Sequence, residues 1–145
     1  MVTAIKFYIG GVKKMVYKTG WVRDYSDYRD YSINITKSMI TLEDKISELC
    51  MPSGVDNRAW CSPIESQGRL GSCTAHAGIG IIEYLERKTF DKHLDASRLF
   101  LYKTTRNLLN WTGDTGAYLR TTMKALRLFG IPPEEYYTYR VDKFD

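Results

Sequence analysis

The feature that most constrains the fold is the stretch CTAHAGIGIIEYLERK, residues 73–88. Over its first ten positions, apolar or small residues occupy almost every face of a helix, which is typical of a helix buried nearly all round. Arg87 and Lys88 at its end suit the negative end of the helix dipole. Gly78 and Gly80 each cost about 1 kcal/mol of helix propensity, but they permit neighbouring elements to approach closely. The stretch therefore predicts a central helix.

A second helix is predicted to follow, with Asp95 or Ser97 as its N-cap, since short polar side chains accept hydrogen bonds from the first backbone N–H groups. It should end near residues 111–113. Its packed side would consist of residues at helical spacing, namely Leu101, Thr105, Leu108 and Leu109.

A third helix is predicted from about Gly116 to Phe129, because Gly130, Ile131 and the following prolines supply a C-cap glycine, a hydrophobic contact and a stop. No strand alternation is long enough to predict a strand. The stripes expected on this helix are a buried one of Leu119, Met123 and Leu126 and an exposed one of Arg120, Lys124 and Arg127.

Length and composition allow one ordinary domain, since the 145 residues are 43% apolar. The net charge of +4 comes from basic residues scattered among acids, so no nucleic-acid partner is expected. No apolar stretch approaches the roughly 20 residues that cross a bilayer, and residues 1–15 do not read as a secretory signal. No membrane partner is therefore predicted. A disulfide framework is not predicted either, because the three cysteines, Cys50, Cys61 and Cys73, are an odd number and lack a short repeated spacing. These features favour a reducing, cytoplasmic setting.

The turn SQGRLGSC, residues 66–73, would deliver Cys73 to the first turn of the central helix. Unpaired N–H groups and the positive dipole end there favour the thiolate, which is the nucleophilic form. The Cys73 N–H would point at a carbonyl oxygen under attack, and the Gln67 amide could supply a second oxyanion donor, typically worth about 3 kcal/mol of barrier. The turn thus predicts a nucleophile with an oxyanion hole, and a buried, inert cysteine is the alternative.

This turn resembles the active-site signature Q-G-x-C-G-S-C-W-A-F of papain-like (C1 family) cysteine peptidases, which it matches at Gln67, Gly68, Gly71, Ser72, Cys73 and Ala75. The surroundings resemble further family segments: V-D-W-R at residues 55–58, P-V at 63–64, S-E-Q-x-L at 95–99 and G-I-x-x-E-x-x-Y-P-Y at 130–139. The Gly-Trp-x-x-Asp stretch that begins at Gly20 resembles the leader of the bacterial and archaeal branch.

The resemblance implies an α+β chain with the papain-like cysteine proteinase fold, covering mainly the helical N-terminal (left) subdomain with the long central helix. Residues 1–54 would be an N-terminal extension or leader, in which the capping-box-like spacing of Thr41 and Asp44 predicts a short helix over Thr41–Cys50. Residues 55–145 would be the N-terminal half of a peptidase domain, without its β-rich C-terminal half.

The function implied is that of a cysteine-type peptidase, which hydrolyses peptide bonds of a peptide or protein substrate through a thioester. Cys73 and Gln67 would be catalytic. Asp114-Thr115-Gly116 resembles the C-x-G-G segment that lines the pocket for the substrate's second side chain. The residues expected to bind substrate are therefore Gly71, Ser72, Asp114, Thr115 and Gly116. Neither a cofactor nor a metal ion is expected.

The chain departs from the family pattern at several positions. Leu70 stands where many members have a disulfide cysteine, and Thr74 and His76 replace the Trp and Phe after the nucleophile. Thr138 replaces a proline, and Gly116 alone stands for the pair of pocket glycines, so the substrate preference of the family is not carried over.

The catalytic His of the family and its Asn lie roughly 130–150 residues beyond the cysteine, and the chain ends at Asp145. His76 is three residues from Cys73 on the same helix, and His93 precedes the next helix, so neither is expected to act as the base. The chain alone is therefore expected to be inactive, with a missing C-terminal half as the partner that supplies His and Asn.

Two other functions are considered. The first is a catalytically silent papain-like module that binds peptides or inhibits a peptidase through the same cleft. The second is a metal site of Cys73 and His76 with Cys61 or His93, which lacks the second ligand pair of a tetrahedral site.

Overall fold

The computed structural model describes residues 19–30 and 53–144. Backbone contacts divide the chain into two units, one formed by Met1–Asp24 with Trp60–Asp145 and the other by Tyr25–Ala59. In the described part of the second unit, Arg58 pairs with Asp56 and Arg29 with Asp27. The helix predicted over Thr41–Cys50 lies outside the described residues.

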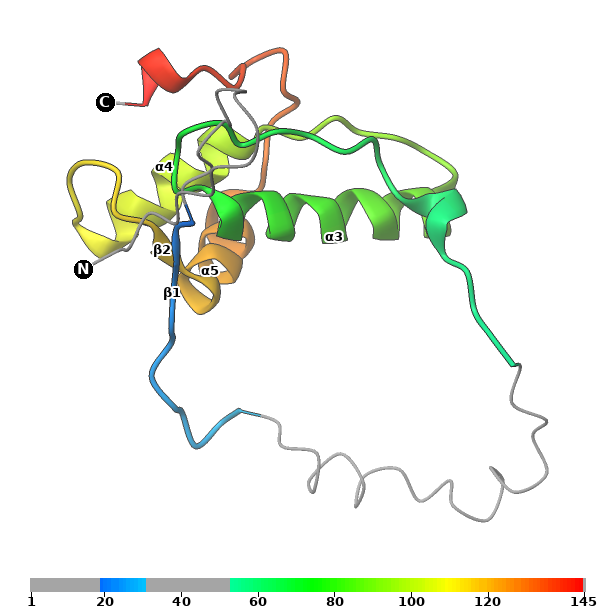
Figure 1. The fold of residues 1–145 in the computed structure, drawn as a ribbon, viewed down its shortest axis with the longest axis horizontal. Helices are drawn as coiled ribbons and strands as arrows, with labels where there is room; N and C mark the ends of the chain where they lie inside the picture. Colours follow the sequence, from blue (N-terminus) through cyan, green and yellow to red (C-terminus); the bar gives the residue numbers. More distant parts are fainter. Residues whose placement is uncertain (1–18, 31–52, 145) are drawn as a thin grey trace, which may run out of the picture. The chain divides into compact units, whose positions relative to one another are not determined.

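Three helices of the first unit confirm the helices predicted after residue 72 (Figure 1). They are α3 (Cys73–Phe90), α4 (Arg98–Leu109) and α5 (Leu119–Phe129), with short 3-10 turns η1 (Arg58–Trp60) and η2 (Val141–Lys143). Of the two N-cap candidates for α4, Ser97 is the one used, since its hydroxyl accepts a hydrogen bond from the Phe100 N–H at 3.2 Å. Gly130 caps α5 as predicted. None of the helices in the described part of the chain is long and apolar enough to cross a membrane.

The core of this unit lies where α3, α4 and α5 meet. Segments 61–72 and 91–97 run back along α3 (Figure 1). Arg87 of this helix donates a hydrogen bond to Cys61 O at 2.8 Å, and the Glu83 carboxylate accepts one from Ala96 N–H at 3.1 Å. The buried apolar residues form one cluster, made of Leu70, Ala75, Ile79, Ala96, Leu99, Leu101, Tyr102, Ala117, Ala125 and Phe144.

Burial of α3 nearly all round is not what the structure shows. Ile79 and Ala75 are buried, but Ile81 is 57% exposed and Leu85 is 48% exposed. The described residues therefore leave part of the surface of α3 exposed. Small and apolar residues occur at both the buried and the exposed positions of α3, so the hydrophobic periodicity did not distinguish its two sides.

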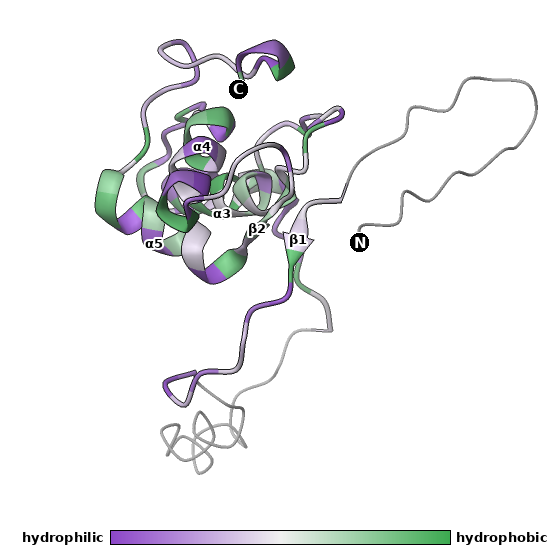
Figure 2. Ribbon diagram, turned by 90° about the vertical axis from the view of Figure 1, so that its left-hand side faces the viewer, coloured by the Kyte–Doolittle hydropathy of each residue, from purple (hydrophilic) through white to green (hydrophobic). Residues whose placement is uncertain are grey.

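The buried stripe predicted for α5 is right for Leu126, which packs against the core, and wrong for Leu119 and Met123. Leu119 and Met123 are 39% and 42% exposed, whereas Thr122 and Ala125 are buried. The reason is a close approach of α5 to Gly78 of α3, where a Cβ would lie 3.5 Å from Thr122 Cγ2, so small residues form the contact. Hydrophobic and hydrophilic residues alternate along the ribbon of α5 (Figure 2).

A short parallel sheet, which the sequence did not predict, joins the start of the described chain to the loop before α5. Strand β1 (Trp21–Val22) pairs with β2 (Ala117–Tyr118), and Ala117 N–H donates to Gly20 O at 2.8 Å. Each strand has two residues, which is too short for an alternating pattern to be visible.

Gly80 and Gly78 provide a matched pair of substitutions on α3. A Cβ at Gly80 meets nothing within 4 Å, so Gly80→Ala should raise the free energy of unfolding by up to about 1 kcal/mol through helix propensity. A Cβ at Gly78 would lie 3.0 Å from Met123 Cε and 3.4 Å from Leu101 Cδ2, so Gly78→Ala should gain less or destabilise. Urea denaturation of both variants measures the difference, and equal gains would contradict it.

Candidate active site

Cys73 is the first residue of α3, as the sequence predicts, and it is only partly buried. The N-cap residue, Ser72, makes no capping hydrogen bond with its side chain. Its hydroxyl lies 2.6 Å from the Tyr139 hydroxyl and 3.3 Å from His76 Nδ1. Because the cap side chain does not occupy the backbone N–H groups of the first turn, this helix start has the arrangement that an oxyanion donor needs.

Gln67 lies in the turn that leads into α3. Its side-chain Nε2 donates to Leu70 O at 3.0 Å, and Leu70 N–H donates back to Gln67 O at 3.3 Å. These two bonds close the turn and orient the side-chain amide, whose nitrogen carries two hydrogens. Both expected oxyanion donors therefore belong to one short turn, and their approach to a substrate oxygen stays a prediction.

Tyr139 clamps this turn from the segment after α5. Its hydroxyl donates to Gln67 O at 2.9 Å and also contacts Ser72 Oγ. Burial raises the pKa of Tyr139, so the hydroxyl keeps its proton near neutral pH. Its backbone N–H donates to Glu134 Oε1, which holds the segment in place. Tyr139 thus joins the residues on either side of the nucleophile loop.

The predicted substrate wall, residues 114–116, is held by the buried Arg106 of α4. The guanidinium donates to Gly116 O at 2.5 Å, to Thr115 Oγ1 at 3.0 Å and to Thr112 O at 2.8 Å. The same group lies over the rings of Tyr102, Trp111 and Phe144. Arg106 therefore sets the shape of this loop from the core side.

Asp114 faces the nucleophile turn. Gly71 N–H donates to its two carboxylate oxygens at 2.9 and 3.1 Å. The structure therefore brings Asp114 and Gly71 into direct contact, while Thr115 of the same loop is exposed. Their expected role in binding substrate stays a prediction.

The segment at Gly20 lies directly at the nucleophile. Gly20 N–H points to Cys73 Sγ at 3.3 Å. A Cβ on Gly20 would lie 1.6 Å from Gly71 O, and a Cβ on Gly116 would lie 2.0 Å from Gly20 O. Three backbones meet here so closely that Gly20 and Gly116 exclude a side chain, and a Cβ on Gly71 would lie only 3.2 Å from Gly20 Cα. The chain thus supplies an extended peptide beside its own cysteine.

His76 is engaged in packing rather than aimed across a cleft. Its Nδ1 lies 3.1 Å from Ser72 O, and its ring meets the Tyr139 ring edge-on with centroids 5.1 Å apart. Burial lowers the pKa of His76, the contact with Ser72 opposes this, and the charge of Arg98 adds to it. These contacts favour the core interpretation of His76, while His93 is exposed.

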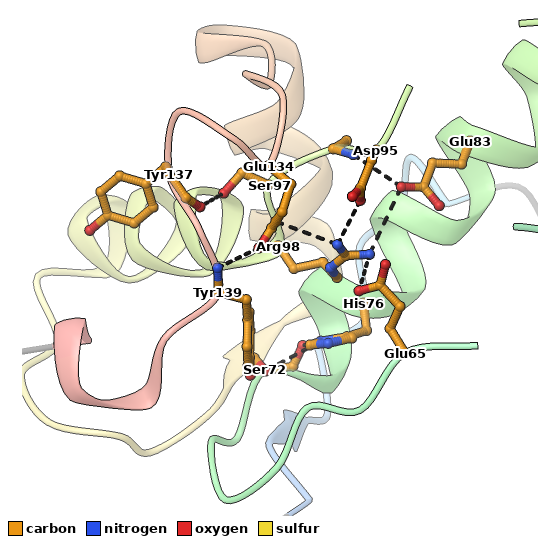
Figure 3. A network of polar contacts seen from close by, with 11 residues as sticks. Glu65, Ser72, His76, Glu83, Asp95, Ser97, Arg98, Glu134, Tyr137 and Tyr139 are labelled. Carbon is orange, nitrogen blue, oxygen red and sulfur yellow. Dashed lines mark hydrogen bonds and ion pairs between the residues drawn. The ribbon is translucent and has the colours of Figure 1, made fainter. Parts of the chain in front are cut away.

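A charge cluster around the buried Arg98 lies beside the nucleophile turn (Figure 3). Arg98 at the start of α4 pairs with Glu65, with Asp95 at 2.8 Å and with Glu134 at 3.4 Å, and Glu83 lies 3.9 Å away. The partners come from the segment before α3, from α3, from the α3–α4 loop and from the segment after α5. The cluster thereby ties these four segments together.

Sequence reasoning assigned no role to Tyr102, Arg106 or Tyr139. Tyr139 falls in the stretch that resembles Y-P-Y, but its partners are about 70 residues away, and sequence spacing does not reveal them. Tyr102 and Arg106 are four residues apart on α4, so they share a face, and this spacing of two polar residues beside an apolar stripe was the available signal.

Within residues 19–30 and 53–144, no group of three or more His, Cys, Asp or Glu side chains is arranged to hold a metal ion. In particular, Cys73 is contacted by Gly20, and the Nδ1 of His76 is turned to Ser72. The described geometry offers no support for the alternative of a metal site at these two residues.

Known proteins resemble the chain over most of its length. An uncharacterized peptidase C1-like protein of Acanthamoeba polyphaga mimivirus is 30% identical over 136 residues, covering 86% of this chain and 43% of that protein. The crystal structure of xylellain, a cysteine protease from Xylella fastidiosa, matches with a TM-score of 0.63 and 32% identity over 84% of this chain and 43% of that chain. No family model matches.

The chain is a relative of the papain-like (C1) cysteine peptidases. A structure described for antibody cross-reactivity between the mite allergens Blo t 1 and Der p 1 has the same fold, with a TM-score of 0.54 and 23% identity over 62% of this chain and 31% of that chain. The predicted papain-like α+β fold is thus confirmed for the part present. The chain spans less than half the length of each of these relatives.

Gly20→Ala tests the contact at the nucleophile of this papain-like chain. The new methyl group has no room beside Gly71 O, so the segment must leave Cys73. Cys73 should then react with iodoacetamide several-fold faster relative to Cys61, as measured by peptide mapping with mass spectrometry. Gly54→Ala is the control, because a Cβ there meets nothing within 4 Å. Equal Cys73 to Cys61 ratios in all three proteins would contradict the contact.

The lowered pKa of His76 predicts a pH dependence of stability. The unfolded chain binds this proton with the ordinary pKa of about 6.5, whereas the folded chain binds it more weakly. The contribution of neutral His76 is therefore fully present above about pH 6.5 and is lost as the pH falls below it. His76→Gln should show a smaller loss of unfolding free energy between about pH 7.5 and 5.5 than the unmodified chain. His93→Gln should behave like the unmodified chain, and an unchanged pH slope in His76→Gln would refute the assignment.

Proposed function

We propose that the protein is a cysteine peptidase whose nucleophile is Cys73, and that this chain carries the nucleophile and oxyanion half of the active site. One observation carries the proposal. An extended peptide, the chain's own segment from Gly20 to Val22, lies beside Cys73 Sγ and is held through backbone pairing with Ala117 and Tyr118. Peptide cleavage requires a surface that binds the peptide backbone and a nucleophile beside it. The pairing with residues 117–118 and the position of Cys73 at the start of α3 supply these two parts.

The proposed chemistry follows from these positions. Cys73 Sγ attacks the carbonyl carbon of the bound peptide, and the sulfur–carbon bond forms as the carbonyl oxygen takes up negative charge. The Cys73 N–H and the Gln67 amide would hold that oxygen. A proton must then reach the leaving amine for the thioester to form, and water releases the acyl group in the second step. The histidine that moves this proton, with its asparagine, would come from a C-terminal half.

The supporting evidence is of two kinds. The chain is similar to xylellain, which is a cysteine protease, and to a peptidase C1-like protein. The geometry adds a cysteine at the first residue of a helix, with a glutamine fixed on the preceding turn. Peptide or protein substrates are the class that fits a cysteine already contacted by an extended backbone segment.

The natural polypeptide from the source tests the proposal. Its intact mass and peptide map show whether it continues past Asp145 through a His and an Asn, and a peptide substrate measures activity. Cys73→Ser should lower kcat by about 10³ or more, and Gln67→Ala by about 10²–10³. Cys61→Ser is the control for loss of a thiol and should leave kcat unchanged. Hydrolysis that survives Cys73→Ser would rule out this nucleophile.

A second function is favoured by the same segment, because the chain holds a peptide at Cys73 with no histidine of the described part facing it. In that case the protein is a silent papain-like module that binds peptides or inhibits a peptidase. A natural polypeptide that binds peptides equally well before and after Cys73→Ala, and hydrolyses none, would replace the peptidase proposal with this one.

A further inference from the structure

The Asp114 carboxylate is the meeting point of three elements. It accepts both bonds from Gly71 N–H, two residues before the nucleophile, at 2.9 and 3.1 Å. It also accepts the Tyr102 hydroxyl of α4 at 2.7 Å. Hydrogen bonds to an ionised acceptor are roughly twice as strong as neutral ones. Asp114 therefore fixes the nucleophile turn to α4 through one charged group.

Tyr102 extends this connection to the substrate wall. Its hydroxyl donates to Asp114 and accepts from Gly116 N–H at 3.0 Å. Burial and the neighbouring carboxylate raise the pKa of Tyr102 well above its usual range, so the proton stays on the phenol and the direction of the bond is fixed. The ring is fully buried in the core and stacks on Phe144 at 5.1 Å. Tyr102 thus has one fixed position from which it reaches both loops.

We propose that Asp114 and Tyr102 are positioning residues that hold the Gly71 turn, and with it the Cys73 N–H, at a fixed place relative to the substrate wall at Gly116. The clasp they form acts through the backbone N–H groups of Gly71 and Gly116. This inference rests on the proposed function only in its consequence for catalysis, because the coupling itself is a property of the folded chain.

The sequence contains an argument for why such a clasp is needed. Leu70 stands where many papain-like peptidases have a disulfide cysteine, and Asp114 stands at the position of the cysteine in the C-x-G-G pattern. Neither position can therefore be tied covalently in this chain. Leu70 is instead buried in the core, and Asp114 binds the next residue along, Gly71.

Amide hydrogen exchange followed by mass spectrometry tests the coupling on the chain itself. Asp114→Asn, which keeps the shape and removes the charge, should speed exchange of the Gly71 amide by about tenfold, as expected for loss of bonds to a charged group. Tyr102→Phe should speed exchange at both Gly71 and Gly116, although its hydroxyl bonds only the second of these amides. Exchange in the middle of α4 and α5 should stay within about twofold, which separates positioning from general destabilisation.

Two matched controls accompany these variants. Asp56→Asn removes an exposed carboxylate that pairs with Arg58, and Tyr84→Phe removes a hydroxyl that bonds only Lys88 among the described contacts. Neither should change exchange at Gly71. If Tyr102→Phe leaves Gly71 exchange unchanged, or if exchange rises equally throughout α4 and α5, the clasp is refuted.

The catalytic consequence is measured separately on the natural polypeptide. Asp114→Asn should lower kcat by about tenfold with KM changed less than about threefold, because the oxyanion donor is displaced. Tyr102→Phe should change both constants, because it also releases the wall at Gly116. An unchanged kcat in Asp114→Asn would refute the positioning role. A natural polypeptide without peptidase activity would overturn the proposed function alone, since the exchange result stands by itself.

Discussion

The arrangement around the nucleophile depends on the burial of one guanidinium group. Arg98 is 4% exposed and lies among four carboxylates, those of Glu65, Glu83, Asp95 and Glu134. An unpaired charge in such a place would cost several kcal/mol, so the fold must place carboxylates around it. The four carboxylates come from four different segments of the chain. One group thereby specifies how α3, the start of α4 and two loops come together, which is a demand on the fold that apolar contacts alone do not make.

What this cluster positions is a site built largely from backbone. Glu134 holds the backbone of Tyr139, whose hydroxyl in turn reaches Gln67 O and Ser72 Oγ. On the opposite side of the turn, Asp114 holds the Gly71 N–H. Side chains thus hold the nucleophile turn in place, while the groups that would contact a peptide are the sulfur of Cys73 and main-chain atoms. Such a site depends on these side-chain contacts and on the glycines that let the backbones approach.

The helices could be predicted from residues close together in the sequence, whereas contacts between distant residues could not. The Ser97 cap, the Gly130 stop and the position of Cys73 at a helix start all follow from neighbouring residues. The packing face of α5 was predicted only in part, because small residues at a close helix crossing outweigh apolar periodicity there. Gly20 and Cys73 are 53 positions apart in the sequence. Because the contact uses the backbone N–H of a glycine, no side-chain chemistry indicates it in the sequence.

The tie between Asp114 and Gly71 also determines which changes in the surroundings the site can sense. A disulfide is broken by reductants, whereas the contacts of Asp114 with Gly71 and Tyr102 are hydrogen bonds, which a reductant does not cleave. The nucleophile turn is therefore held equally well in a reducing and an oxidising compartment.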